Sequence, residues 1–372
     1  MAIFKTLVTK IPIPNDKKIK QKSYLQMENL AIIDQGLSFI GGYTNDTSYQ
    51  LDFDLPVIVF GDHTCCVKYL TFPFAAGADG IKVLKPCINV LPKYLYYGTQ
   101  YLVLCLPDRG YARHYQHIEK MELPVPPIEE QQRIVTRIEE LFSELDSAVE
   151  TLQKTRQQLE VYRQAVLKEA FDGFAEKTTV REMTSIVTSG SRGWAKYYSD
   201  NGAMFIRIGN LTHSGIGIDF SDIQHLCLPE NAEGRRSRLV QGDILVSITA
   251  DLGSIGLIPE NIGEAYINQH IALVRFNNKK QSRFMAWYFR SDCGQKELLK
   301  NKRGAGKLGL GLDDIRDSLV PVVSDEVAEL TVANIESRLS VCDGIEKTIN
   351  EALQQAEAMR QSILKKAFEG NL

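Results

Sequence analysis

The 372-residue sequence lacks the features that mark membrane, secreted and disulfide-rich proteins. It has no run of about 18 apolar residues, the least that a membrane-spanning helix needs. Its first seven residues lack the apolar stretch and the small-residue cleavage site of a signal peptide. Its seven cysteines form no CxxC pair, and the neighbouring Cys65 and Cys66 are interpreted as a buried small apolar pair rather than a redox centre. Reduced thiols of this kind predict a cytoplasmic protein.

Motifs of catalysis and metal binding are also missing. Gly304–Lys307 lacks the upstream glycine spacing and the following Ser or Thr of a phosphate-binding loop. His114 and His117 have no cysteine or carboxylate partner at metal-ligand spacing, so we expect no metal site. Asp62 and His63 are not accompanied by a GxSxG nucleophile motif. These missing motifs give poor support to a stand-alone enzyme.

Net charge is low, at −3 with a pI near 6.1, which argues against a general polyanion binder. The charge is nevertheless partitioned along the chain. Residues 1–123 carry 13 basic against 11 acidic side chains and residues 176–320 carry 19 against 16. Residues 124–175 carry 6 against 10, and residues 321–372 carry 5 against 9. Two mildly basic regions thus alternate with two acidic ones, although excesses of this size also occur in ordinary solvated surfaces.

What the chain does have is a single long internal repeat. Arg163–Gly173 returns 197 residues later as Arg360–Gly370, with seven of eleven positions identical. The same offset pairs Pro124 with Pro321, Ile138 with Ile335 and Asp146 with Asp343. A period of this length is too long for a solenoid. It predicts two large modules, each followed by the same long helix, and approximate two-fold symmetry within one chain.

The repeated segments are predicted to be long helices. Pro127 suits a first helical turn, Glu129 and Glu130 suit the positive end of the helix dipole, and Gly173 suits a helix end. Apolar residues follow the 4-3 alternation of a coiled-coil seam. The predicted seam residues are Ile138, Leu141, Leu145, Leu152 and Leu159 in the first copy and Ile335, Ile345, Ile349, Met359 and Ile363 in the second. We expect an antiparallel pair; the alternative is that each helix packs separately on its own module.

The two modules are predicted to be mixed α/β and to correspond loosely to each other. Strands are expected at 30–33, 57–60, 81–84 and 101–104 in the first module and at 204–208, 244–248 and 271–276 in the second. Aromatic helices are expected around Tyr94–Tyr97 and Phe284–Trp287.

Basic residues gather in loops that suit contact with nucleic acid, since Arg and Lys bind guanine edges and phosphates. The candidates of the first module are Lys68, Lys82, Lys85, Arg109 and Arg113, with the run Lys17–Lys22 as a further phosphate-contacting segment. Those of the second are Arg192, Arg207, Arg235, Arg236, Arg238, Lys302, Arg303 and Lys307. The alternative is that these clusters are solvated basic loops.

In several of these segments the chain resembles the specificity subunits of Type I restriction–modification systems. The resemblance is carried by Leu123–Val135, by the helix end Leu167–Gly173, by Ile33–Asn45 and Phe60–Thr64 in the first module, and by Phe205–Leu211 and Ile267–Leu273 in the second.

This resemblance implies an α+β architecture in which two α/β target recognition domains are separated by two long conserved helices that form an antiparallel coiled coil. The implied boundaries are 1–123 for the first recognition domain, 124–175 for the central helical spacer, 176–320 for the second recognition domain and 321–372 for the C-terminal spacer. Each recognition domain would read one half of a bipartite, asymmetric DNA site, and the helices would dock two methyltransferase subunits. Restriction subunits would join the complex, and S-adenosylmethionine, ATP and Mg would belong to the partners.

Two further expectations follow. Members of the family commonly open with a short Trp-containing segment, for which the second module has a counterpart at Val180–Trp194. The first module, which begins near Phe4, is expected to lack one. The alternative function is a coiled-coil adaptor that binds protein partners without DNA specificity.

Overall fold

The chain folds into two compact units in a computed structural model that describes all residues except 78–79, 108–109, 111, 213–214, 230–234 and 301–308. The side chain of Arg235 also lies outside the described part. One unit comprises residues 1–153 and 350–372, and the other comprises residues 154–349. Each unit therefore contains one module together with a segment of both long helices. The four segment boundaries predicted from the sequence remain a prediction.

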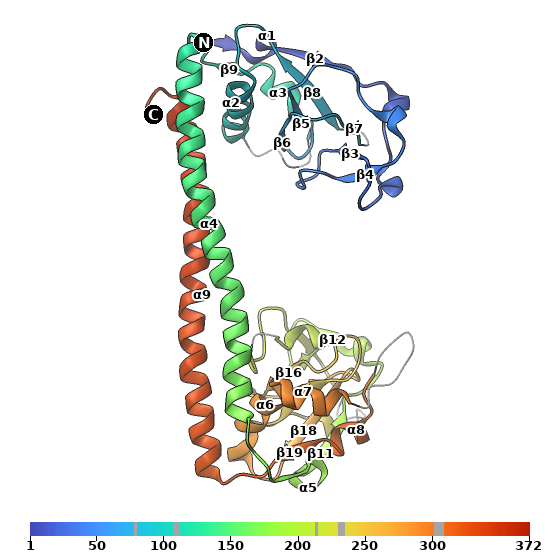
Figure 1. Ribbon diagram of the computed structural model, residues 1–372. Coiled ribbons are helices and arrows are strands. Elements are labelled where there is room, and N and C mark those ends of the chain that lie inside the picture. The colour runs from blue at the N-terminus through green and yellow to red at the C-terminus, as the bar shows by residue number, and fades with distance from the viewer. Residues whose placement is uncertain (78–79, 108–109, 111, 213–214, 230–234, 301–308) are drawn as a thin grey trace. The chain divides into compact units, whose positions relative to one another are not determined.

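The first module rests on two sheets, with strand orders β2-β8-β5-β6 and β4-β3-β7, and on the small pair β1-β9. Its helix α2 packs on the sheet face that carries Phe60 and Leu84 (Figure 1). Its elements are β1 (Ala2–Ile3), α1 (Phe4–Leu7), β2 (Val8–Ile11), β3 (Leu30–Ile33), β4 (Gly42–Thr44), β5 (Val57–Gly61), β6 (Val67–Leu70), β7 (Ala75–Ala76), β8 (Ile81–Pro86), α2 (Pro92–Leu104), α3 (Tyr115–Ile118) and β9 (Glu122–Leu123).

The second module repeats this plan. Its sheets have the orders β11-β18-β15-β16 and β12-β14-β13-β17, and β10 pairs with β19. In both modules the second sheet contains one parallel pair, β3 with β7 and β13 with β17. The elements are β10 (Lys177–Thr179), α5 (Val180–Met183), β11 (Thr184–Ser189), β12 (Tyr198–Ser199), β13 (Ala203–Ile206), β14 (Gln224–Leu226), β15 (Ile244–Ser247), β16 (Ile255–Leu257), β17 (Ala265–Ile267), β18 (Ile271–Phe276), α6 (Ser282–Arg290), α7 (Asp292–Leu299), α8 (Leu312–Arg316) and β19 (Leu319–Pro321).

One predicted strand is wrong. Tyr101–Leu104 does not form a strand but continues helix α2. The sequence prediction treated Gly98 as a breaker, whereas this glycine lies inside the helix and lets Leu123 pack closely. A Cβ at position 98 would lie 2.6 Å from Leu123 Cδ2. A short apolar run does not by itself distinguish a strand from a buried helix.

The opening segment of the first module also differs from the expectation. The sequence predicted no counterpart to Val180–Trp194, but β1 and α1 correspond to β10 and α5. The Phe4 amide donates to Met121 O at 2.8 Å, and the Val180 amide donates in the same way to Ser318 O at 3.0 Å. What the first module lacks is the tryptophan. Lys18 in the first module and Ser191 in the second form corresponding parallel bridges, to Ala76 and to Asn268. After these bridges the first module buries Ile19 in its core, and the second module buries Trp194.

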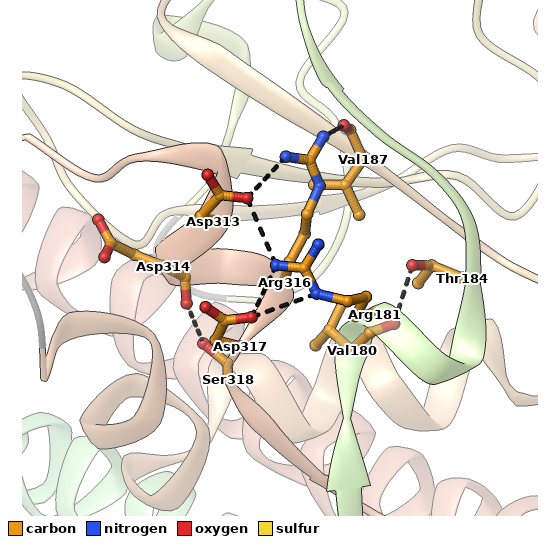
Figure 2. A network of polar contacts seen from close by, with 9 residues as sticks. All are labelled: Val180, Arg181, Thr184, Val187, Asp313, Asp314, Arg316, Asp317 and Ser318. Atoms are coloured by element: carbon orange, nitrogen blue, oxygen red, sulfur yellow. Dashed lines mark hydrogen bonds and ion pairs between the residues drawn. The ribbon is translucent and has the colours of Figure 1, made fainter.

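A polar network fixes the opening segment of the second module, as Figure 2 shows. Arg181 on α5 donates to Asp317 at 2.8 Å and to Asp313 at 3.4 Å. Arg316 donates to Asp313 at 2.9 Å and to the carbonyl oxygen of Val187 on β11 at 2.6 Å. Helix α8 is thereby tied to both α5 and β11, which sets where β11 enters the larger sheet.

The two long helices are α4 (Ile128–Phe171) and α9 (Asp325–Phe368), each of 44 residues. Both end shortly before a left-handed glycine, Gly173 with φ 94° and Gly370 with φ 80°. In the unit of residues 154–349 they run antiparallel, because Glu169 pairs with Arg338 and Arg156 pairs with Glu346.

Both helices contribute to the core of each module. Phe142 of α4 and Phe368 of α9 belong to one core with Tyr94 of the first module. Phe171 of α4 and Ile335 of α9 share another with residues of the second. Separate packing of each helix on its own module, the alternative interpretation, is therefore wrong.

The seam is largely as predicted, with one correction. Ile138, Ile335 and Ile349 are buried, and the remaining predicted residues of α4 are half-buried, as is Ile363. Ile345 and Met359 are 41% and 55% exposed, so their predicted place in the seam is wrong. The adjacent Glu346 and Arg360 turn toward the partner helix instead. Glu346 pairs with Arg163, and Arg360 pairs with Asp146 and lies over the Phe142 ring, so charged side chains make the contacts between the helices at these two levels.

Candidate nucleic-acid interface

A cationic cleft of about 600 Å³ lies at one edge of the larger sheet of the first module. Its lining includes Lys10 on β2, Lys18, Lys82 on β8 and Arg113, together with His63 and Asp62. Asp62 supplies the only carboxylate of the described lining residues, so the basic side chains exceed the acidic ones by three. We call this surface the first cleft. A concentration of cations in a concave surface suits a polyanionic ligand.

Asp62 connects β8 to the segment around Tyr115 on the inner side of the first cleft. Its carboxylate lies 3.3 Å from Lys82 Nζ and accepts a hydrogen bond from the Tyr115 amide at 2.9 Å. Its backbone carbonyl accepts from the His114 amide at 2.8 Å. The carboxylate is almost fully buried, so it braces the segment that carries Arg113 without exposing its own charge to a ligand.

The predicted residues of the first module separate into distinct groups. Lys82 and Arg113 line the cleft together, and Arg113 is exposed. Lys85 lies toward the other end of β8, where it pairs with Asp54 at 2.7 Å. Lys68 is buried under a loop, so the structure does not favour it as a contact to nucleic acid. Arg109 lies outside the described residues.

Sequence reasoning missed Lys10 and did not single out Lys18 within its basic run. Lys10 is on the edge strand β2, and its ammonium lies 5.7 Å from the centre of the Tyr115 ring. An isolated lysine in an alternating strand gives no cluster signal. Only the pairing of β2 with β8 brings it beside the other cations.

A second cleft, of about 460 Å³, lies in the second module. It is lined by Arg207, Asn268 and His270 and by two carboxylates, Asp219 and Asp222. His270 Nδ1 lies 2.7 Å from Thr249 Oγ1, and His270 Nε2 lies 2.9 Å from the amide nitrogen of Gln269. Amide, imidazole and guanidinium groups thus take the place of the lysines of the first cleft.

The predicted residues of the second module are placed as follows. Arg207 lines the second cleft and lies 3.2 Å from Asp222. Arg192 is exposed next to Ser191, which is bridged to Asn268. Arg236 and Arg238 are exposed around a separate turn at residues 235–237. The side chain of Arg235 and all of Lys302, Arg303 and Lys307 lie outside the described part.

The two clefts have one bordering segment in common, because the first is lined by the residues that enter β8 and the second by the residues that precede its counterpart β18. The first cleft also takes residues from β2 and from just after the end of β5, whereas the second takes residues that follow β13. In both modules a later segment of the chain donates a backbone hydrogen bond to the residue that follows β5 or its counterpart β15. The His114 amide donates to Asp62 O at 2.8 Å, and the Leu310 amide donates to Ile248 O at 3.0 Å. The predicted basic residues Arg109 and Arg113, and Lys302 to Lys307, precede these anchor points in the sequence.

Within the part of the chain that the structure describes, no group of three or more His, Cys, Asp or Glu side chains is arranged to hold a metal ion. Burial raises the pKa of the Cys65 thiol, which disfavours the reactive thiolate, and Cys65 and Cys66 are half-buried. Among the described helices, none is long and apolar enough to cross a membrane.

A separate apolar surface runs along α9 in the unit of residues 154–349. Val327, Leu330, Val341 and Ile345 are exposed by 42%, 73%, 63% and 41%. Their spacings of three, eleven and four residues place them along one face of a helix with about 3.6 residues per turn. We call these four residues the α9 stripe.

Comparisons with known proteins agree with these features. Residues 15–161 match the family model of the Type I restriction modification DNA specificity domain. The chain is 26% identical over 280 residues to the Type I restriction enzyme EcoBI specificity subunit of Escherichia coli, covering 67% of this chain and 58% of that protein. It is 29% identical over 278 residues to the StySPI specificity subunit of Salmonella potsdam, with 68% and 58% covered. The matches thus span less than two thirds of these relatives.

Solved structures show the same fold. One, from work on complex assembly and conformational transition of the type I R-M system, superposes with a TM-score of 0.72 at 15% identity, covering 100% of this chain and 97% of that one. The HsdS subunit from Thermoanaerobacter tengcongensis superposes with a TM-score of 0.52 at 15% identity, covering 100% and 96%. The chain thus contains a region that matches the Type I DNA specificity domain, is similar over about two thirds of its length to specificity subunits of Type I restriction–modification systems, and shares the fold of the HsdS subunit.

Proposed function

We propose that this chain is the sequence-specific DNA-recognition subunit of a Type I restriction–modification complex. Each module reads one half of a bipartite, asymmetric site. The observation that carries the proposal is that each module has a polar cleft beside the start of one matching strand, β8 or β18, and that the two linings differ. The common fold suits two modules that bind DNA in a similar manner, and the different linings suit two different half-sites. The similarity to specificity subunits supports this function over a coiled-coil adaptor without DNA specificity.

The chemistry of the linings indicates how each half is read. Lys10, Lys18 and Lys82 suit phosphate oxygens and the acceptor atoms of guanine. Arg207 also suits guanine, while the amide of Asn268 suits the N6 and N7 pattern of adenine. Arg113, which lines the first cleft, and Arg192, whose neighbour Ser191 is bridged to Asn268 of the second cleft, are exposed and so are available to a ligand.

The long helices are proposed to dock two methyltransferase subunits. The α9 stripe presents apolar side chains on a helix that is otherwise acidic, a pattern typical of a protein-binding surface. Methyl transfer and DNA cleavage would take place in methyltransferase and restriction subunits, which would also hold S-adenosylmethionine, ATP and Mg. This chain would then act in the cytoplasm as a non-catalytic part of the complex.

A salt titration tests the DNA-binding role. Affinity of the full chain for duplex DNA should fall steeply with added salt, because each phosphate contact releases condensed counterions. Arg113→Gln should weaken binding and, where the arginine contacts a phosphate, reduce the salt slope by about one. Arg137→Gln, on an exposed turn of α4, is the matched control and should change neither quantity. Binding that does not respond to salt, or an equal effect of both variants, would contradict the proposal.

A further inference from the structure

Lys68 is a buried cation with a purely internal set of partners. Its side chain is 5% exposed, and its ammonium donates to Asp34 O at 2.8 Å and to Ser38 O at 2.6 Å. The Asp34 carboxylate lies 3.8 Å away. Burial lowers the pKa of this ammonium, and the hydrogen bonds and the nearby carboxylate oppose that effect. Burying a charge is costly unless its hydrogen bonds are satisfied, so the placement of Lys68 has a structural purpose.

That purpose is to hold the loop of residues 34–41 between β3 and β4. The lysine bonds to carbonyl groups on both sides of the turn. The Asp34 carboxylate accepts from the Gly36 amide at 2.9 Å, and the Gly41 amide donates to Ile32 O at 2.9 Å. Hydrogen bonds therefore hold the loop at several points on its buried side.

The same loop presents two large apolar side chains to solvent. Leu37 is 90% exposed and Phe39 is 49% exposed. Phe39 makes an edge contact to Phe72 with the ring centres 6.2 Å apart, so its orientation is set. Single exposed apolar residues are common on protein surfaces, but two on one internally braced loop form a built surface feature.

The loop is joined directly to the first cleft. The His63 amide donates to Gln35 Oε1 at 3.2 Å, and Thr64 Oγ1 donates to Gln35 O at 2.5 Å. His63 lines the cleft. The exposed apolar side chain of Leu37 cannot bind a phosphate. It does match the one apolar group that a base edge offers in the major groove, the C5 methyl of thymine.

We propose that Leu37 contacts a thymine methyl in the half-site read by the first module, and that Lys68 is the positioning residue that sets the loop for this contact. The inference rests on the proposed function. It assigns to Lys68 a role beneath the interface, in place of the direct DNA contact predicted from the sequence.

Replacing thymine by uracil in the duplex tests the contact, because uracil lacks only the C5 methyl. The probe is the duplex that the full wild-type chain selects from a random library, made with either base. Wild-type protein should bind the thymine duplex about fourfold more tightly, the loss expected for one apolar carbon left in water. Leu37→Ala should bind both duplexes equally and keep its unfolding midpoint. Ile88→Ala, a fully exposed apolar side chain beyond the other end of β8, is the control and should keep the fourfold difference.

Lys68→Met should lose the thymine preference in the same way, and Lys68→Arg, which retains a charged donor, should recover part of it. A merely structural role of Lys68 would lower stability without removing the preference. Retention of the fourfold difference by Leu37→Ala would overturn the inference, as would release of a protein partner by that variant with DNA discrimination intact. Wild-type protein that selects no duplex at all would overturn the proposed function itself. Wild-type protein that selects a duplex but binds its uracil form equally well would overturn only this inference.

Discussion

At the scale of single residues, two reciprocal ion pairs express the internal symmetry of the chain. Arg163 on α4 donates to Asp343 on α9 at 2.7 Å, and Arg360 on α9 pairs with Asp146 on α4. Each arginine and each aspartate is 197 residues from its counterpart. The same contact is thus made once in each unit. The repeated sequence keeps the residues that join the two helices to each other.

Arg163→Met should therefore destabilise the helix pair. Arg163 is 14% exposed and donates to Asp343 and to Glu346, so its loss removes two charged hydrogen bonds and leaves Glu346 paired with Arg156 at 3.9 Å. The expected loss is about 1–3 kcal/mol of unfolding free energy, measured by urea denaturation. Arg137→Met is the control. Its pair with Glu140 is exposed and should contribute roughly 0.5 kcal/mol or less. Equal losses for the two variants would contradict this account.

The candidate site was partly predictable at this scale. Lys82 and Arg113 were identified from local sequence and lie in one cleft. Lys68 was misplaced because a lysine on an alternating strand is normally solvated, and only the fold shows the β3–β4 loop covering it. Lys10 was missed because its neighbours in the cleft come from segments far away in the sequence. The residue types alone made these side chains candidates for contact with nucleic acid, whereas their grouping in one cleft required the sheet topology.

At the scale of elements, the two long helices were the best predicted part of the fold. Their period, starts and glycine ends are strong local signals, and the prediction failed only where arginine and glutamate replace apolar side chains in the seam. The prediction for Tyr101–Leu104 failed for a different reason, since helix α2 is decided by packing around Gly98.

Ile349 and Ile345 provide a matched test of the corrected seam. Ile349 is 3% exposed and Ile345 is 41% exposed, one turn apart on the same helix. Ile349→Ala should cost about 2–5 kcal/mol of unfolding free energy, as for a buried large-to-small change. Ile345→Ala should cost about 0.5 kcal/mol or less but weaken assembly with the methyltransferase subunit, measured by calorimetry. The reverse ranking of stability would restore the seam predicted from the sequence.

The network around helix α8 makes a pH-dependent contribution to stability. Its hydrogen bond from Arg316 is the main cause of a lowered pKa of the Asp313 carboxyl group. A carboxyl group whose pKa is lower in the folded state stabilises the protein above its unfolded pKa, and this contribution is lost as the pH falls through the folded value. Asp313→Asn should therefore lower the urea midpoint at pH 7 and have little effect near pH 2. An equal effect at both pH values would show that the charge of Asp313 is not the cause.

At the scale of the whole molecule, the two modules keep one fold, and their clefts have different linings. The sheets, the parallel strand pairs and the returning segments correspond, while lysines line one cleft and amide and imidazole groups line the other. Clefts that differ in lining on a common fold are the arrangement expected when two recognition surfaces share one kind of support. The central claim is that the two modules read separate halves of one site.

Selection of bound duplexes from a random library tests that claim most directly, using the full chain assembled with its methyltransferase partner. Wild-type protein should select two short sequence blocks at a fixed separation. Arg113→Ala should weaken the preference in one block only, and Arg192→Ala should weaken it in the other only; both side chains are exposed, so neither change disturbs a core. Loss of preference in both blocks from either variant, or selection of a single continuous block, would contradict the account.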